Sequence, residues 1–410
     1  MELFAYLVPY GLEWLNLLVR WLHVITGIAW IGASFYFVWL DNSIRPPAPG
    51  SELAKKGVSG ELWAVHGGGF YNPQKYLVAP AELPKELHWF KWEAYSTWLS
   101  GIALLTIAYY FNAQAMMIDK SVADITSLQA VGIGVGTLVV GWTVYDLLCR
   151  SPLGKHDFWF GVVIFALIVA AAYGLTHVLS GRAAYIHVGA LIGTIMVGNV
   201  LMLIIPGQRK MVEAMSAGRM PDPVHGQKAK QRSVHNNYFT LPVLFIMISN
   251  HYAMTYRHEY SWLVLAMIMA AGVFIRHFFN LRHKGRVEWR YPVLGLALLA
   301  AVAVAIAPSR PAAVAAAPAV DPQAAAKQFA QVKTIIDHRC VSCHAAQPKQ
   351  AGFAAAPAGI MLENEAEIRQ NAEKIYKQTV QLKAMPLANL TQMTDAERAQ
   401  VAAWYEAGAK

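Results

Sequence analysis

Charged side chains are scarce in this sequence, and their scarcity narrows the class of protein. Only 14% of the 410 residues are charged, whereas 56% are hydrophobic, and the mean hydropathy is positive at +0.34. The chain also contains 13 Trp and 18 Tyr residues. A soluble enzyme of this length would carry more charge, so the composition indicates a membrane protein with many interfacial aromatic residues.

Cysteine and several common motifs are nearly absent. The three cysteines, at positions 149, 340 and 343, are too few for a zinc site of four thiolates. The glycine run 67–69 is not followed by the Gly-Lys-Ser/Thr of a phosphate-binding loop. The apolar segments hold no His-His pair of a binuclear centre, which disfavours a haem-copper oxidase. The first apolar stretch is too long for a cleavable signal peptide and holds Arg20, so we expect it to span the membrane.

The most specific motif is Cys340-Val341-Ser342-Cys343-His344. Two thiols at this spacing can form thioethers with the two vinyl groups of one haem, and the adjacent histidine can bind the iron. The motif therefore predicts one covalently attached haem c, with Cys340, Cys343 and His344 as its ligands. The alternative is a fortuitous dithiol.

A second axial ligand is predicted at Met385. It precedes Pro386, follows a predicted helix from about 363 to 382, and comes before a last helix with a capping box formed by Thr394 and Glu397. The sequence thus predicts His344 and Met385 as the two iron ligands. Met361 and Met393 are the competing candidates, and core packing is the alternative for all three methionines.

Apolar runs long enough to cross a membrane occur in eight places. The predicted spans are residues 12–40, 95–111, 129–149, 158–179, 183–206, 238–256, 259–279 and 291–307. We expect an all-α fold, with a polytopic transmembrane bundle over residues 1–307, a Pro/Ala-rich linker over 308–325 and a small helical cytochrome c domain over 326–410.

The loops between these spans predict the orientation in the membrane. Haem c is attached on the outer side of the bacterial inner membrane, which places the C-terminal domain and, with eight spans, the N-terminus on the periplasmic side. The loops then placed inside carry eighteen Lys and Arg residues, against three in the outside loops. This bias agrees with the positive-inside rule and explains much of the net charge of +9, so we infer no nucleic-acid binding from that charge.

Four histidines fall in the outer halves of predicted spans, namely His23, His177, His187 and His251. Three of them have small residues beside them at helical spacing, as Gly27 lies beside His23. Because a flat macrocycle fits against such a face, we expect some of the four to be axial ligands of a haem b in the bundle. Interhelical hydrogen bonding and a proton path are the alternatives.

A second group is predicted on the inner side. The loop 41–94 carries His66, Tyr71 and Lys75, and His235 precedes the sixth span. Cationic and hydrogen-bonding side chains of this kind could bind a polar heterocycle and form a catalytic site. A purely structural glycine turn at 67–69 is the alternative for that loop.

The whole chain resembles the bacterial membrane-bound urate oxidase (urate hydroxylase) family, in which an eight-span domain is fused to a cytochrome c. The resemblance rests on residues 20–32, on 66–71 with 74–76, on 89–95, on 235–236 with 249–252, and on the haem motif. It implies oxidation of urate to 5-hydroxyisourate, with electrons passed to the haem and on to a downstream cytochrome or terminal oxidase instead of dioxygen. A second one-electron centre would let the two electrons leave in sequence. The competing functions are a non-catalytic membrane electron-transfer subunit and a transporter with an appended cytochrome.

Overall fold

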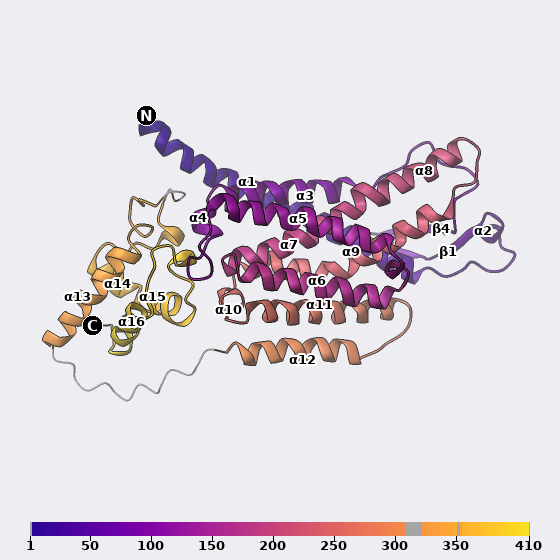
Figure 1. Ribbon diagram of the computed structural model, residues 1–410. Helices are drawn as coiled ribbons and strands as arrows, with labels where there is room; N and C mark the ends of the chain where they lie inside the picture. The colour runs from indigo at the N-terminus through magenta and orange to yellow at the C-terminus, as the bar shows by residue number, and fades with distance from the viewer. Residues whose placement is uncertain (1, 308–321, 351–352, 354, 410) are drawn as a thin grey trace.

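The computed structural model describes residues 2–307, 322–350, 353 and 355–409, and its side chains from residue 10. Helices occupy all eight ranges predicted as spans and lie side by side in one elongated bundle (Figure 1). They are α1 (Glu2–Ser43), α3 (Trp92–Leu105), α5 (Ser127–Arg150), α6 (Asp157–Thr176), α7 (Gly181–Gly198), α9 (Pro223–Ser249), α11 (Ser261–His283) and α12 (Arg290–Ala305). The predicted all-α bundle is therefore confirmed.

Five of the described helical segments are long and apolar enough to cross a membrane by length and composition, and α12 is a shorter apolar helix. One of the five is continuous from Gly181 to Ser216, because α7 passes through a π-helical segment (Asn199–Ile204) into α8 (Ile205–Ser216). A second π-helical segment, Thr106–Tyr110, extends α3. These apolar helices fit a multi-pass membrane protein.

The helix in the sixth predicted range, α9, is not among the five candidate spans, and it begins earlier than the sequence predicts. We expected it to start at residue 238, but α9 starts at Pro223, where the Asp222 side chain accepts a hydrogen bond from the Val224 amide. A proline at the first helical position and a capping aspartate favour this start. The basic segment before the span is thus helical instead of a loop, which lengthens α9 beyond the apolar part.

The long loop after α1 contains strands that the sequence did not predict. It holds α2 (Glu52–Lys55) and two antiparallel pairs, β1 (Val58–Glu61) with β4 (Gln74–Tyr76) and β2 (Ala64–His66) with β3 (Gly69–Tyr71). Gly67 and Gly68 form the β2–β3 turn with φ of 57° and 81°, values that favour glycine. The glycine run is therefore a hairpin turn, as the structural alternative predicted.

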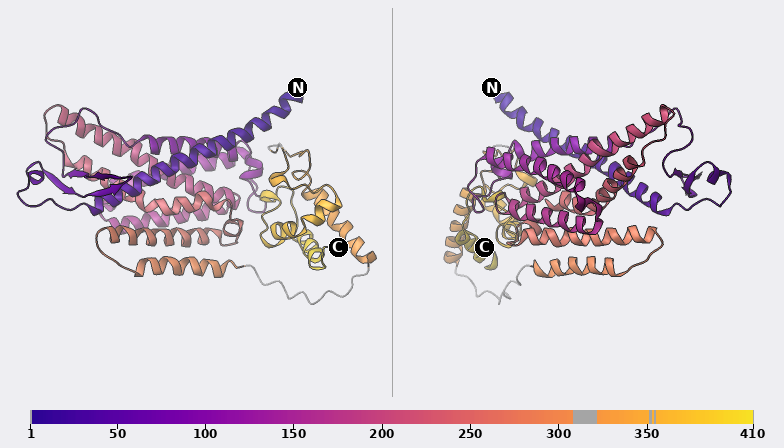
Figure 2. Two further views of the ribbon diagram at one scale, coloured as in Figure 1. Left: turned by 180° about the vertical axis from the view of Figure 1, so that it is seen from behind. Right: turned by 45° about the vertical axis from the view of Figure 1, so that its right-hand side comes forward.

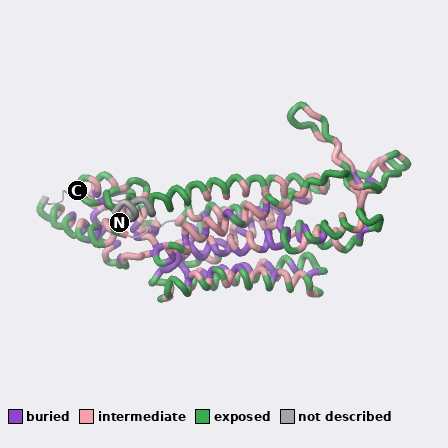
Figure 3. The backbone as a smooth tube through the Cα atoms, turned by 90° about the horizontal axis from the view of Figure 1, so that it is seen from above, coloured by how far each residue is buried: buried purple, intermediate pink, exposed green. Residues whose placement is uncertain are grey.

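The centre of the bundle is α7, most of whose residues are buried. Figure 3 shows that the buried residues lie along the middle of the bundle and the exposed ones along its outside. Glycines allow its neighbours to approach closely. A Cβ atom at Gly141 would overlap Leu191, one at Gly189 would overlap Ile246, and one at Gly134 would overlap the His187 ring. Close packing through small residues is the usual source of helix association in a membrane, where apolar burial gives little driving force.

The C-terminal domain consists of α13 (Pro322–Arg339), α14 (Glu365–Gln370), α15 (Ala372–Tyr376) and α16 (Asp395–Glu406) around a small core that includes Trp404. The helix predicted over 363–382 is broken. Asn371, with φ of −103° and ψ of 13°, separates α14 from α15, and both its side-chain amide and its backbone N–H donate to the Glu367 carbonyl, at 2.9 and 3.1 Å. Residues 308–321, most of the predicted linker, lie outside the described residues.

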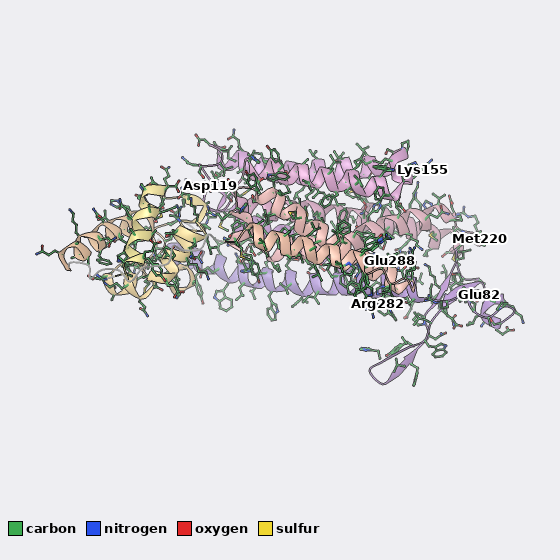
Figure 4. All side chains as sticks on the ribbon, turned by 90° about the horizontal axis from the view of Figure 1, so that it is seen from below. Glu82, Asp119, Lys155, Met220, Arg282 and Glu288 are labelled. Carbon is green, nitrogen blue, oxygen red and sulfur yellow. The ribbon has the colours of Figure 1, made fainter. Side chains whose placement is uncertain are left out.

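Successive loops between the helices lie at opposite ends of the bundle, as expected for a chain that crosses from one side to the other with each helix. The C-terminal domain, α4 (Ala113–Met116) and α10 (Ala253–Tyr256) lie at one end, which we call the docked end (Figures 1 and 2). Figure 4 shows Asp119 at that end, and Lys155 and Arg282 at the opposite end, which we call the far end. The basic loops thus gather away from the C-terminal domain, and the β-hairpins project from the far end (Figure 2).

Candidate functional site

The haem-attachment motif lies in a tight turn directly after α13. The amides of Cys343 and His344 both donate to the Cys340 carbonyl, at 3.1 and 2.9 Å. Cys340 is buried, Cys343 is half-buried, and neither forms a disulfide. Both thiols are therefore available on one short turn for attachment to the same group.

The ring of His344 is oriented by the main chain. Its Nδ1 lies 2.8 Å from the carbonyl oxygen of Ile360, to which it donates as the Nδ1–H tautomer. That bond leaves Nε2 as the nitrogen with a free lone pair, which is the arrangement found for histidines that ligate metals. The two thiols and the oriented imidazole fit a covalently bound haem c.

Met385 lies in a loop that is fixed on both sides. Its amide donates to Gln378 at 3.0 Å, and its carbonyl accepts from Arg398 at 2.8 Å. Of the two competitors, Met393 is only 4% exposed within the domain core, which identifies it as packing, and Met361 is 39% exposed. Met385 therefore remains the predicted second axial ligand.

The last helix begins as the sequence predicted. Thr394 and Glu397 form a complete capping box at the start of α16. Burial of the Glu397 carboxyl opposes its ionisation, but hydrogen bonds from the Thr394 backbone and from Arg339 outweigh that effect and hold the pKa of Glu397 below its usual 4.5. The ionised form of Glu397 therefore stabilises this end of the domain.

The segment 382–394, which carries Met385 between the π-helical turn Lys377–Gln381 and α16, is the methionine loop, and it contacts the docked end of the bundle. Arg257, which follows α10, donates to the Ala384 carbonyl at 3.3 Å and lies 3.7 Å from a carboxylate oxygen of Asp119. Asp119 is itself buried at 5% exposure and accepts from the Ser121 hydroxyl at 2.5 Å. One arginine thus connects a bundle carboxylate to the residue before Met385.

Two of the four outer histidines lie inside the bundle. His23 Nδ1 bonds to the Thr97 carbonyl at 3.0 Å, and His187 Nδ1 bonds to the Ala183 carbonyl at 2.8 Å. Either bond leaves Nε2 as the nitrogen that could bind a metal, but His187 Nε2 already lies 3.3 Å from the Tyr110 hydroxyl. Interhelical and local hydrogen bonding thus accounts for the contacts of both rings.

The other two outer histidines occupy helix ends. His177 is the exposed C-cap of α6 and bonds to the Tyr173 carbonyl, and His251 is exposed just after α9. Within the described residues, no group of three or more metal-binding side chains forms a cluster. A haem b bound by two of the four histidines therefore stays a prediction.

The four residues predicted to form a catalytic site on the inner side do not lie together in the structure. His66 and Tyr71 are exposed on the β2–β3 hairpin, whereas Lys75 forms an ion pair with Asp41 at the end of α1. His235 lies within the bundle, stacked on Phe160 at 4.6 Å between ring centroids. The structure thus gives these residues three different environments.

His235 belongs to a buried polar network that the sequence analysis did not identify. The Tyr145 hydroxyl bonds to His235 at 2.8 Å and accepts from Asn199 at 2.9 Å. Arg232 joins Asn199 to Asp146, with bonds of 2.9 and 2.7 Å. A charged residue near the end of an apolar run, such as Asp146, is the signal that could have revealed it.

Comparison with known families agrees with this division of the chain. The family model "Urate oxidase N-terminal" matches residues 9–307, and the model "Cytochrome c" matches residues 329–406. No curated protein and no solved structure matches the chain. The first match covers well over half of the sequence, and the second covers the haem motif. The chain belongs to the urate oxidase N-terminal family and carries a cytochrome c domain after it.

Proposed function

We propose that this protein oxidises urate to 5-hydroxyisourate and delivers the electrons to the respiratory chain through its own cytochrome c domain. The observation that carries the proposal is the fusion of the two matched families in one chain, with the methionine loop docked on the bundle through Arg257. An oxidoreductase domain joined to a one-electron carrier needs no dioxygen as its oxidant, so we expect no peroxide.

The balance of the reaction defines what the protein must handle. One water supplies the oxygen added at C5 of the purine, and the conversion of the urate monoanion to the 5-hydroxyisourate monoanion releases two protons and two electrons. A haem held by Cys340, Cys343 and His344 supplies a one-electron acceptor, so the two electrons leave one at a time. The chain itself must bind an anionic purine, exclude competing oxidants and give the protons a route to water.

We further propose that the protein lies in the bacterial inner membrane with the docked end on the periplasmic side. The four basic loops lie at the far end, and basic loops favour the cytoplasmic face. The downstream acceptor would be a soluble cytochrome or a terminal oxidase that reaches the C-terminal domain from the periplasm.

Urate-dependent reduction of the haem absorbance in washed, anaerobic membranes tests the proposal. We expect reduction with wild-type protein and none with Cys343→Ser protein that lacks attached haem. Dithionite serves as the reductant control. If urate fails to reduce a haem that dithionite reduces, the chain is a non-catalytic electron carrier. A pyridine haemochrome count in the same preparation tests for haem b beside haem c.

A further inference from the structure

A pocket of about 230 Å³ lies where the C-terminal domain meets the bundle. It is lined by Asp119, Arg182, Arg257 and Glu259 from the docked end and by Ala384 and Leu387 from the methionine loop. We call it the interdomain pocket. Ala384 precedes Met385 and Leu387 follows it by two residues, so a molecule in this pocket lies against the loop that carries the predicted iron ligand.

Arg182 supplies unused hydrogen-bonding capacity at this pocket. One of its terminal nitrogens donates to the Asn250 carbonyl at 3.0 Å. Its Nε, however, is buried without a hydrogen-bond partner among the described residues, and so is the side-chain oxygen of Asn250. A buried donor left unpaired costs free energy, which makes such a group a natural contact for a polar ligand.

The charges at the pocket favour an anion. Burial lowers the pKa of the Arg257 guanidinium, Asp119 raises it, and the nearby positive charge of Arg182 lowers it further. Asp119 is the carboxylate partner of Arg257, whereas Arg182 has no ion-pair partner among the described residues. Glu259 is exposed, so water screens its charge. One half-buried positive charge, that of Arg182, is therefore left for a ligand to neutralise.

The size and position of the pocket restrict that ligand. Sites for drug-sized molecules measure about 300–1,000 Å³, so a pocket of about 230 Å³ suits a compact ring system. Gly181, at the start of α7, lies so close to the Tyr256 carbonyl oxygen that a Cβ atom at position 181 would overlap it. This places the first turn of a long helix, with its partial positive charge, beside Arg182.

The polar network around His235 is a poorer candidate, although it is more extensive. In that network the Asn199, Arg232 and Asp146 side chains already bond to one another. None of its members appears among the buried polar atoms that lack a partner. A buried network in which each polar group already has a hydrogen-bond partner stabilises helix packing. A ligand site, by contrast, contains polar groups that are still free to bond to the ligand.

We propose that the interdomain pocket is the urate site, where the Arg182 guanidinium binds the purine anion beside the methionine loop. This inference rests on the proposed function. Arg182 is the principal anion-binding residue, Arg257 holds the methionine loop against the pocket, and Glu259 on the rim opposes anion entry. An anion held here would lie close to the electron-accepting domain without a relay across the bundle.

Steady-state kinetics of full-length variants, each with its haem content measured, test the inference. We expect Arg182→Gln to raise the KM for urate roughly tenfold or more, because a hydrogen bond to a charged group is lost. Glu259→Gln should lower KM by about twofold, since an exposed like charge is removed. Lys120→Gln is the matched control, because it removes one exposed positive charge at the docked end without lining the pocket.

The KM for urate is expected to rise in Arg182→Gln protein and to fall in Glu259→Gln protein. Misfolding would not produce both changes. A wild-type KM in haem-loaded Arg182→Gln protein overturns the inference, as does a wild-type KM in Glu259→Gln protein if the arginine variant fails to accumulate. A tenfold rise in KM in His66→Ala or Lys75→Ala protein, with none in Arg182→Gln, moves the site to the far end. In these cases wild-type urate turnover keeps the proposed function intact. No turnover by the wild-type protein overturns both.

Discussion

Arg398 is the residue whose loss should most directly disturb the predicted axial methionine. It is 6% exposed on α16 and donates to the carbonyls of Thr379 and Met385, the second at 2.8 Å. Another of its nitrogens lies 3.4 Å from the Asn389 side-chain oxygen. A single guanidinium therefore holds both sides of the methionine loop in place.

The expected cost of replacing Arg398 by leucine follows from these contacts. A hydrogen bond to a charged group contributes about 1.5–3 kcal/mol, so the loss of the bonds to both carbonyls would cost roughly 3–6 kcal/mol. Burying a charge has a desolvation cost, and burial lowers the pKa of the Arg398 guanidinium in the same sense. Leucine removes that cost, so we expect a net loss of about 2–4 kcal/mol from the stability of the domain.

Denaturant unfolding of the full-length protein in detergent, followed by haem absorbance, measures this loss. We expect Arg398→Leu to lower the midpoint and weaken the spectral signature of methionine-ligated ferric haem. Arg398→Lys should be intermediate, because one ammonium can replace the nitrogen that bonds to both carbonyls but not the second nitrogen that faces Asn389. An unchanged midpoint and an unchanged spectrum in Arg398→Leu protein would refute the assigned role.

Three further predictions address the packing, the pH dependence and the haem attachment. Gly134→Ala should reduce the amount of folded protein in membranes, because its Cβ would overlap the His187 ring, whereas Gly132→Ala, with open space around it, should be neutral by the same quantification. The capping contacts of Glu397 should be fully present above pH 4.5 and lost as the pH falls through its lower native pKa, so acid unfolding should begin at higher pH in Glu397→Gln protein. Cys343→Ser should lose most covalent haem, as measured by haem staining after denaturing electrophoresis.

The sequence predicted the helices well because apolar length is a strong physical constraint. A helix that crosses a membrane needs about 20 apolar residues, and all eight predicted ranges contain helices. The haem motif and the family resemblance were equally accessible, since both depend on local residue order, and the family matches agree with them. The start of α9 was missed because its first turns are polar, and apolar periodicity cannot detect a helix that leaves the membrane.

Side-chain partners were much harder to predict. The grouping of His66 with His235 rested on their shared side of the membrane, but His66 is exposed on the β2–β3 hairpin, whereas His235 is stacked on Phe160 within the bundle. The partner of His235 is Tyr145, ninety residues away in sequence. Spacing along one helix gives the face of a residue, yet only the packing of several helices decides which faces meet.

The two ends of the bundle therefore carry polar residues of different kinds. At the far end, the ring of His235 is enclosed by Tyr145 and Phe160, and its neighbours satisfy one another. At the docked end, Arg182 keeps an unpaired donor beside a pocket that opens next to the methionine loop. On the proposed function, urate oxidation needs an anion site, water for C5 and an outlet for two protons, all within reach of the haem domain. The docked end combines a pocket in which Arg182 has no carboxylate partner among the described residues with the exposed Glu259 in the same lining, so we expect the chemistry there and a structural role for the His235 network.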